Sequence, residues 1–127
     1  MQPTSLLLVG AGGALGAMAR YLVAVLVTAR LGTSWPWATF LINVTGCFAI
    51  GFFMALFTDQ IVAIHPHWRL FFPIGFVGAY TTFSTYEYET LLLIEQGRWL
   101  AAGAYVGGST IAGFAAVLAA VWLARRF

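Results

Sequence analysis

Four long apolar runs, separated by short polar connectors, make up most of this chain. A hydrocarbon core about 30 Å thick needs about 20 apolar residues in each helix that crosses it, and every run has about that length. The connectors contain proline and glycine, which interrupt helices. The pattern therefore predicts one domain, residues 1–127, with four membrane-spanning helices. The runs cover about residues 6–29, 37–57, 68–94 and 100–123.

The tryptophans and the composition agree with this prediction. Indole rings favour the membrane–water interface, and every tryptophan falls at the end of a predicted helix. Hydrophobic residues make up 61% of the chain and charged residues only 8%. A soluble fold of 127 residues could not bury that much apolar surface. The tryptophans are Trp35, Trp37, Trp68, Trp99 and Trp122.

The third run contains an unusual polar segment, GFVGAYTTFSTYEYE, from Gly75 to Glu89. Glycine, threonine and serine stand where a continuous membrane helix favours leucine. Irregular backbone at membrane depth is tolerated only where protein buries it or where it lines a cavity. We therefore predict a helix break near Gly78 to Thr82, whose carbonyl groups could bind a cation and whose amides could bind an anion.

Two aromatic residues follow the predicted break. Phe83 and Tyr86 are three residues apart and so lie on one helix face, where they could also be ordinary core packing. Aromatic rings have positive edges, which can line an anion path without a full charge that would trap the ion. Asn43, in the middle of the second run, can donate hydrogen bonds from its side-chain amide. Together the three residues indicate an anion route.

The arginines give only a weak orientation signal. Cytoplasmic loops normally carry the excess of lysine and arginine, but this chain has no lysine. Its loop and terminal arginines divide three against two between the two sides. We therefore expect the chain to insert in both orientations, which permits an antiparallel homodimer. One side holds Arg69, Arg125 and Arg126, and the other holds Arg30 and Arg98.

Other motifs indicate packing rather than chemistry. Glycines four residues apart, which let membrane helices approach closely, occur at positions 12 and 16 and again at 103 and 107. No nucleophile–base pattern, catalytic carboxylate pair or phosphate-binding loop appears, so the sequence gives no support for an enzyme. Nothing in it indicates a nucleic-acid partner.

At this point the pattern matches a known family. The central asparagine of the second run, the GxxGxxTTFST segment of the third and an arginine in the first resemble the Fluc (CrcB) family of fluoride channels, over nearly the whole chain. The resemblance implies an all-α membrane protein with four transmembrane helices, the third of them broken. It also implies an antiparallel, dual-topology homodimer with two fluoride pores and a structural Na⁺ at its centre.

The resemblance assigns roles to individual residues. Gly78 and Thr81 match the positions whose backbone carbonyls hold the Na⁺. Asn43 and Phe83 match pore residues, and Tyr86 replaces a phenylalanine, adding a hydroxyl that could donate to fluoride or block it. Arg20 matches an arginine near an aqueous vestibule, where a cation raises the local anion concentration. Tyr105 and Ser109 resemble a polar track beside the pore, with Thr39, Thr82 and Ser84 as weaker candidates; Glu89 matches a family glutamate, and neither it nor Glu87 is assigned a pore role.

The function implied by the resemblance is passive export of fluoride across the plasma membrane, the inner membrane of a bacterium. The expected partners are fluoride, the lipid bilayer and a second copy of the chain. Two alternatives are a small four-helix multidrug exporter and a structural or assembly subunit of a membrane complex. The exporter needs an acidic residue in the first helix, where this chain has Arg20 instead. The subunit predicts no ion flux from the purified protein.

Overall fold

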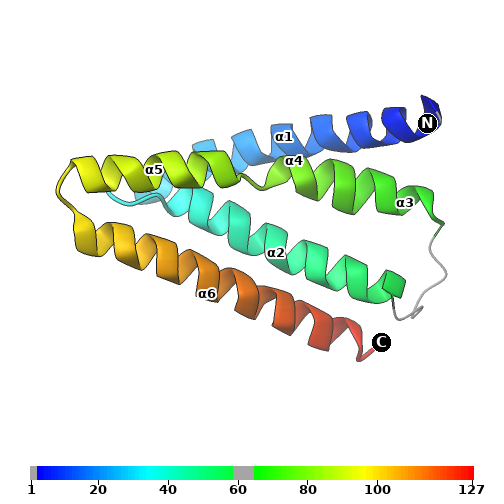
Figure 1. The fold of residues 1–127 in the computed structure, drawn as a ribbon. Coiled ribbons are helices and arrows are strands. Elements are labelled where there is room, and N and C mark those ends of the chain that lie inside the picture. Colours follow the sequence, from blue (N-terminus) through cyan, green and yellow to red (C-terminus); the bar gives the residue numbers. More distant parts are fainter. Residues whose placement is uncertain (1–2, 59–64) are drawn as a thin grey trace.

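All regular structure in residues 3–58 and 65–127, which the computed structural model describes, is helical (Figure 1). Most of the connector between the second and third runs lies outside these residues. The first, second and fourth runs each form one long helix, whereas the third consists of four consecutive helical segments. The elements are α1 (Pro3–Leu31), α2 (Trp37–Thr58), α3 (His67–Arg69), η1 (Leu70–Val77), α4 (Gly78–Tyr80), α5 (Phe83–Glu95) and α6 (Trp99–Ala124).

The long helices lie side by side as a bundle (Figure 1). Among the described residues, α1, α2 and α6 are long and apolar enough to cross a membrane. Helix α2 packs against α6, and α1 packs against η1 and α4, while α5 lies against the first part of α6. The N- and C-termini are at one end of the bundle, and the α1–α2 and α5–α6 connectors are at the other. This up-and-down order agrees with the predicted sequence of helices.

Glycines end two of the helices at the connector end of the bundle. Gly32 follows α1 with φ 74° and Gly97 follows α5 with φ 73°, a left-handed conformation in which only glycine avoids a steric cost. The Gly32 amide donates to the Thr28 carbonyl at 2.9 Å, and the Gly97 amide donates to the Ile94 carbonyl at 2.9 Å. These bonds satisfy carbonyls at the helix ends and turn the chain sharply.

Small residues bring α1 close to η1. A Cβ atom at Gly12 would collide with the Phe71 carbonyl oxygen, and one at Gly16 would collide with the Phe76 carbonyl oxygen. The expected close approach at this glycine pair is confirmed. The second pair differs, because a Cβ atom at position 103 or 107 would have no described atom of this chain within 4 Å.

The π-helical segment η1 contains Pro73, which is buried. Proline has no amide hydrogen, and its ring clashes with the carbonyl four residues earlier in an α-helix; a wider turn gives the ring room. The wider spacing is visible at the end of the segment, where the Gly78 amide donates to the Pro73 carbonyl, five residues back.

Much of the surface of the single chain is apolar. Large side chains on α1 and α6 are exposed, including Leu7 at 72% and Ile111 at 73%. Exposed apolar surface of this extent indicates contact with lipid or with another protein chain. A cluster of buried side chains lies at the connector end of the bundle, between α5 and α6. This cluster consists of Tyr86, Leu93, Ala102 and Tyr105, with Trp35 and Phe40 packed against it.

Candidate functional site

The helical backbone is interrupted between α4 and α5. Thr81 has ψ 159° and Thr82 has φ −149° and ψ 116°, both extended conformations. Thr82 caps the following helix, because its hydroxyl oxygen accepts from the Thr85 amide at 3.3 Å. The Thr82 O–H group donates to the Thr85 hydroxyl at 2.9 Å. The Thr81 amide and hydroxyl both donate to the Val77 carbonyl, at 3.1 and 3.0 Å. The threonine-rich sequence thus provides the hydrogen bonds that end one helix and begin the next.

Asn43 on α2 binds this interruption through its side-chain amide. The amide nitrogen donates to the Thr82 carbonyl at 3.0 Å, and the amide oxygen accepts from the Thr82 amide at 2.9 Å. One side chain therefore satisfies both backbone groups of a residue that neither helix includes. The sequence predicted that Asn43 is a hydrogen-bond donor, but it gave no indication of this backbone partner.

An open recess of about 250 Å³ surrounds this contact. Asn43 lines it together with residues of the interruption and with Phe83, the first residue of α5. The Phe83 side chain is 73% exposed in the single chain, so one side of the recess has no wall from the described residues. The remaining lining residues are Gly46, Cys47, Ile50, Val77, Thr81 and Thr82.

The aromatic residues form a chain of ring contacts that leads from the recess into the core. The Phe83 and Tyr86 ring centroids are 5.8 Å apart, and those of Tyr86 and Tyr105 are 5.0 Å apart. Phe83 is exposed, whereas Tyr86 is 9% exposed and Tyr105 is fully buried. The Tyr86 hydroxyl donates to the Val106 carbonyl of α6 at 3.4 Å. The structure thus gives this hydroxyl a protein acceptor, whereas the sequence only suggested a contact with an ion.

Glu89 joins three helices at the inner end of this aromatic chain. Its two carboxylate oxygens accept hydrogen bonds from the Thr39 hydroxyl at 3.0 Å and from the Tyr105 hydroxyl at 2.7 Å. Hydrogen bonds to an ionised acceptor are shorter and stronger than neutral ones. Glu89 was not predicted as a site residue, although an acidic side chain inside an apolar run is itself a signal. Its partners could not be found without the packing of α2, α5 and α6.

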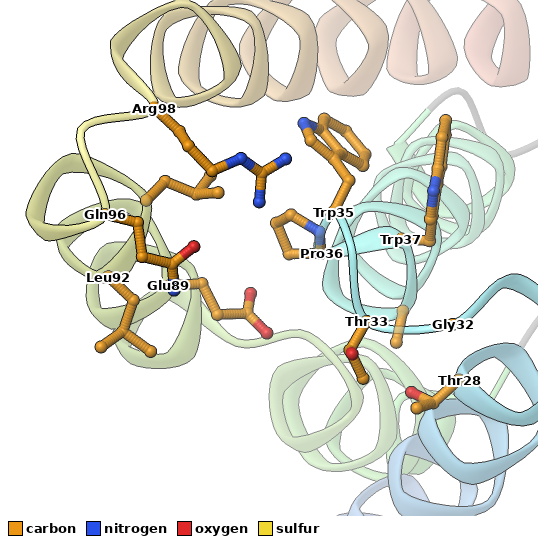
Figure 2. Close-up of a pocket in the computed structure, with 12 residues that line it drawn as sticks. Thr28, Gly32, Thr33, Trp35, Pro36, Trp37, Glu89, Leu92, Gln96 and Arg98 are labelled. Atoms are coloured by element: carbon orange, nitrogen blue, oxygen red, sulfur yellow. The ribbon is translucent and has the colours of Figure 1, made fainter.

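A second recess, of about 160 Å³, lies beside Glu89 at the connector end. Figure 2 shows the Glu89 carboxylate and the Arg98 guanidinium directed into this space, with Trp35 and Pro36 on the opposite wall. It also contains polar groups from Thr33 and from the end of α5. The recess is therefore lined by both an acidic and a basic side chain.

The other predicted site residues line neither recess. The Ser84 hydroxyl oxygen is 3.5 Å from that of Thr82. The buried Ser109 hydroxyl has no hydrogen-bond partner among the described residues. Arg20 is half-buried on α1 and lines neither recess. Gly78 begins α4, three residues before Thr81, and no group of three metal-binding side chains is found in residues 3–58 and 65–127.

Comparison with known proteins identifies the family. The family profile described as "CrcB-like protein, Camphor Resistance (CrcB)" matches residues 7–121. The chain belongs to this family. The match to the CrcB profile covers the interruption at Thr81 and Thr82 and the residues that contact Glu89. No part of the site lies outside it.

Individual CrcB relatives align with almost the whole chain. A protein of Acidobacterium capsulatum is 51% identical over 115 residues, which are 91% of this chain and 88% of the relative. A protein of Solibacter usitatus is 45% identical over 94% of this chain and 98% of its own length. One of Koribacter versatilis is 45% identical over 92% of each chain. All three are named "Fluoride-specific ion channel FluC".

Proposed function

We propose that this protein is a fluoride-selective ion channel of the bacterial inner membrane, which lets fluoride leave the cytoplasm. The observation that carries the proposal is the open recess at Thr81 and Thr82, where an amide donor on α2 meets an aromatic ring on α5. The proposal is supported by relatives named fluoride-specific ion channels that cover almost the whole chain.

The chemistry of the recess suits a small anion. Fluoride is strongly hydrated, so a pore that admits it has to replace water with close hydrogen-bond donors and positive ring edges. Asn43 supplies an amide, and Phe83 and Tyr86 supply ring edges that carry no full charge. Chloride is larger and would not reach these groups in a narrow space.

The direction of transport follows from weak-acid chemistry. Hydrogen fluoride enters a cell as a neutral molecule when the outside is acidic, and it dissociates in the more alkaline cytoplasm. Fluoride then accumulates inside and can leave through a passive channel, down its electrochemical gradient. Neither ATP nor proton coupling is needed.

Fluoride efflux from liposomes tests the proposed function. Vesicles that contain the purified protein are read with a fluoride electrode, beside a chloride-loaded control. We expect rapid fluoride release and little chloride release, with the flux lost in Phe83→Ile, which removes the ring edge but keeps an apolar side chain. Phe114→Ile, at an exposed aromatic position of α6 outside both recesses, is the matched control. A folded protein without fluoride flux would instead support an assembly subunit.

We also propose that two copies associate in antiparallel orientation. The exposed Phe83 ring and the open side of its recess support this, because a second copy could supply the missing wall. The glycines at positions 103 and 107 support it as well, since a Cβ atom at either would have no described atom of the same chain within 4 Å. Reporters active on only one side of the membrane, fused to the C-terminus, should give signal from both sides. A one-sided signal would contradict the dual topology.

The proposed third transmembrane span runs from α3 to α5 and is broken at Thr81 and Thr82, and we propose that a structural Na⁺ binds there. In a continuous helix the Gly78 carbonyl accepts from the amide of residue 82, and the Thr81 carbonyl accepts from that of residue 85. Both amides instead donate to side chains, to the Asn43 oxygen and to the Thr82 hydroxyl. The two carbonyls are thus deprived of their regular donors, which fits them as oxygen ligands for a hard cation.

Thermal unfolding in different salts tests the proposed Na⁺ site. Purified protein is washed free of Na⁺ and melted in N-methylglucamine chloride, with increasing NaCl at constant ionic strength. We expect the melting temperature to rise with Na⁺ and not with an equal concentration of choline, because only the cation that binds the folded state stabilises it. Equal curves in both salts would contradict the site.

A further inference from the structure

The Asn43 side-chain amide is hydrogen-bonded to the backbone of Thr82, and these bonds determine which of its atoms can face an ion. The Thr82 amide can only donate, so its partner has to be the Asn43 oxygen, at 2.9 Å. The Thr82 carbonyl can only accept, so its partner has to be the Asn43 nitrogen, at 3.0 Å. The chemistry of the partners therefore fixes the orientation of the side-chain amide.

The same contact has two consequences on opposite sides of the interruption. The Asn43 nitrogen has a second N–H bond, and in a planar amide this bond points away from the one that Thr82 uses. Because Asn43 lines the recess beside Phe83, the exposed part of its amide there is a donor, while the oxygen is covered by Thr82. On the other side, the Thr82 amide is kept away from the Gly78 carbonyl, its regular helical partner.

We infer that Asn43 is a positioning residue that keeps the interruption open and orients its own amide for anion selectivity. One pair of hydrogen bonds turns the acceptor oxygen away from the recess, directs an N–H bond into it, and leaves the Gly78 carbonyl for a cation. The inference rests on the proposed channel function. It adds that the anion recess and the proposed Na⁺ site depend on one side chain.

Two substitutions separate the backbone contact from the donor in the recess. Asn43→Asp keeps an acceptor for the Thr82 amide but loses both N–H bonds, the one to the Thr82 carbonyl and the one that faces the recess, whereas Asn43→Ala removes the acceptor as well. The control is Thr45→Ala, one half-turn further along α2, which removes a 3.0 Å hydrogen bond to Tyr80 and leaves the Asn43 contact intact. All three are compared with the unmodified protein as purified in detergent.

The first readout is hydrogen exchange of the Thr82 amide, followed by NMR with ¹⁵N-labelled threonine. Exchange of a protected amide measures how often its hydrogen bond opens. Loss of one net hydrogen bond changes the equilibrium constant for this opening by roughly a factor of three to ten. We expect exchange at Thr82 to rise by roughly that factor in Asn43→Ala and to stay near the original rate in Asn43→Asp and Thr45→Ala. An unchanged rate in Asn43→Ala overturns the inference, and so does a rise in Asn43→Asp equal to that in Asn43→Ala.

The second and third readouts connect the contact to function. The Na⁺ concentration that gives half of the maximal thermal stabilisation should rise roughly tenfold in Asn43→Ala and little in Asn43→Asp. A tenfold change in this concentration is what the loss of one hydrogen bond can cause. Fluoride efflux should be lost in both variants, since neither presents the donor. Efflux retained in Asn43→Asp overturns the donor role. Absence of fluoride flux in the unmodified protein contradicts the channel itself, and the exchange rates at Thr82 still decide the backbone contact.

Discussion

Alanine at Gly12 or Gly16 tests the closest helix contact of the fold. At each position a Cβ atom would collide with a carbonyl oxygen of the third run, from Phe71 or Phe76. A side chain can rotate away from such a collision, but a backbone carbonyl inside a helix cannot. Helix α1 therefore has to move away from η1, and the contacts along the whole seam loosen.

The size of the effect follows from two opposing terms. Alanine favours a helix over glycine by about 1 kcal/mol, so an unobstructed replacement should stabilise α1. Forcing an extra methyl group into a packed site costs about 3 kcal/mol at the upper end of the usual range. We use this upper value because the atom in the way is a backbone carbonyl oxygen, which cannot rotate aside. We expect a net destabilisation of about 2 kcal/mol for each of the two variants.

Two neighbouring glycines provide matched controls. A Cβ atom at Gly13 would be 3.8 Å from the Gly75 carbonyl oxygen, an ordinary contact, and one at Gly10 would have no described atom within 4 Å. Alanine at these positions should be neutral or stabilising by up to about 1 kcal/mol. The free energy of unfolding is measured from denaturation by sodium dodecyl sulfate, followed by circular dichroism. Equal stability of all four variants would refute the assigned α1–η1 contact.

Three further predictions concern the aromatic and acidic residues and a helix end. Tyr86→Phe should keep fluoride efflux within about twofold, because its hydroxyl donates to the Val106 carbonyl and the ring edge is unchanged; loss of flux would show that the hydroxyl contacts the ion. Glu89→Ala should lower the unfolding free energy by about 1–3 kcal/mol, because the fully buried Tyr105 hydroxyl loses its acceptor, and Glu89→Gln should lower it less. Equal melting curves for both variants and the unmodified protein would contradict this role of Glu89. Gly97→Ala should cost about 1–2 kcal/mol, since φ is 73°, and an unchanged melting temperature would contradict the strained turn.

The sequence predicted the elements well because hydrophobic length is a local property. The predicted run 37–57 corresponds to α2 (Trp37–Thr58), and the predicted run 100–123 corresponds to α6 (Trp99–Ala124). The π-helical segment around Pro73 was not predicted. Proline in an apolar run signals a distortion, but whether the chain kinks, breaks or widens depends on the helix packed against it.

The contacts of the site were harder to predict than its residues. Asn43, Phe83 and Tyr86 were identified from residue type and spacing, and the structure joins Asn43 to the interruption and the two rings to each other. The hydrogen bonds of Glu89 join residues 50 and 16 positions apart in the sequence. Such pairs depend on the register between packed helices, which the pattern of one chain does not contain.

The hydrogen-bond inventory of the site limits where an anion can be stabilised. An ion that leaves water needs donors whose hydrogens are not already used by the protein. The Thr39 and Tyr105 hydroxyl hydrogens both go to Glu89, and the Thr82 hydroxyl hydrogen goes to Thr85. Among the predicted pathway residues, the second N–H bond of Asn43 and the hydroxyl of Ser109 have no such commitment in the described part of the chain. In the described part of the chain, the unused donors of the predicted pathway residues thus lie on α2 and α6.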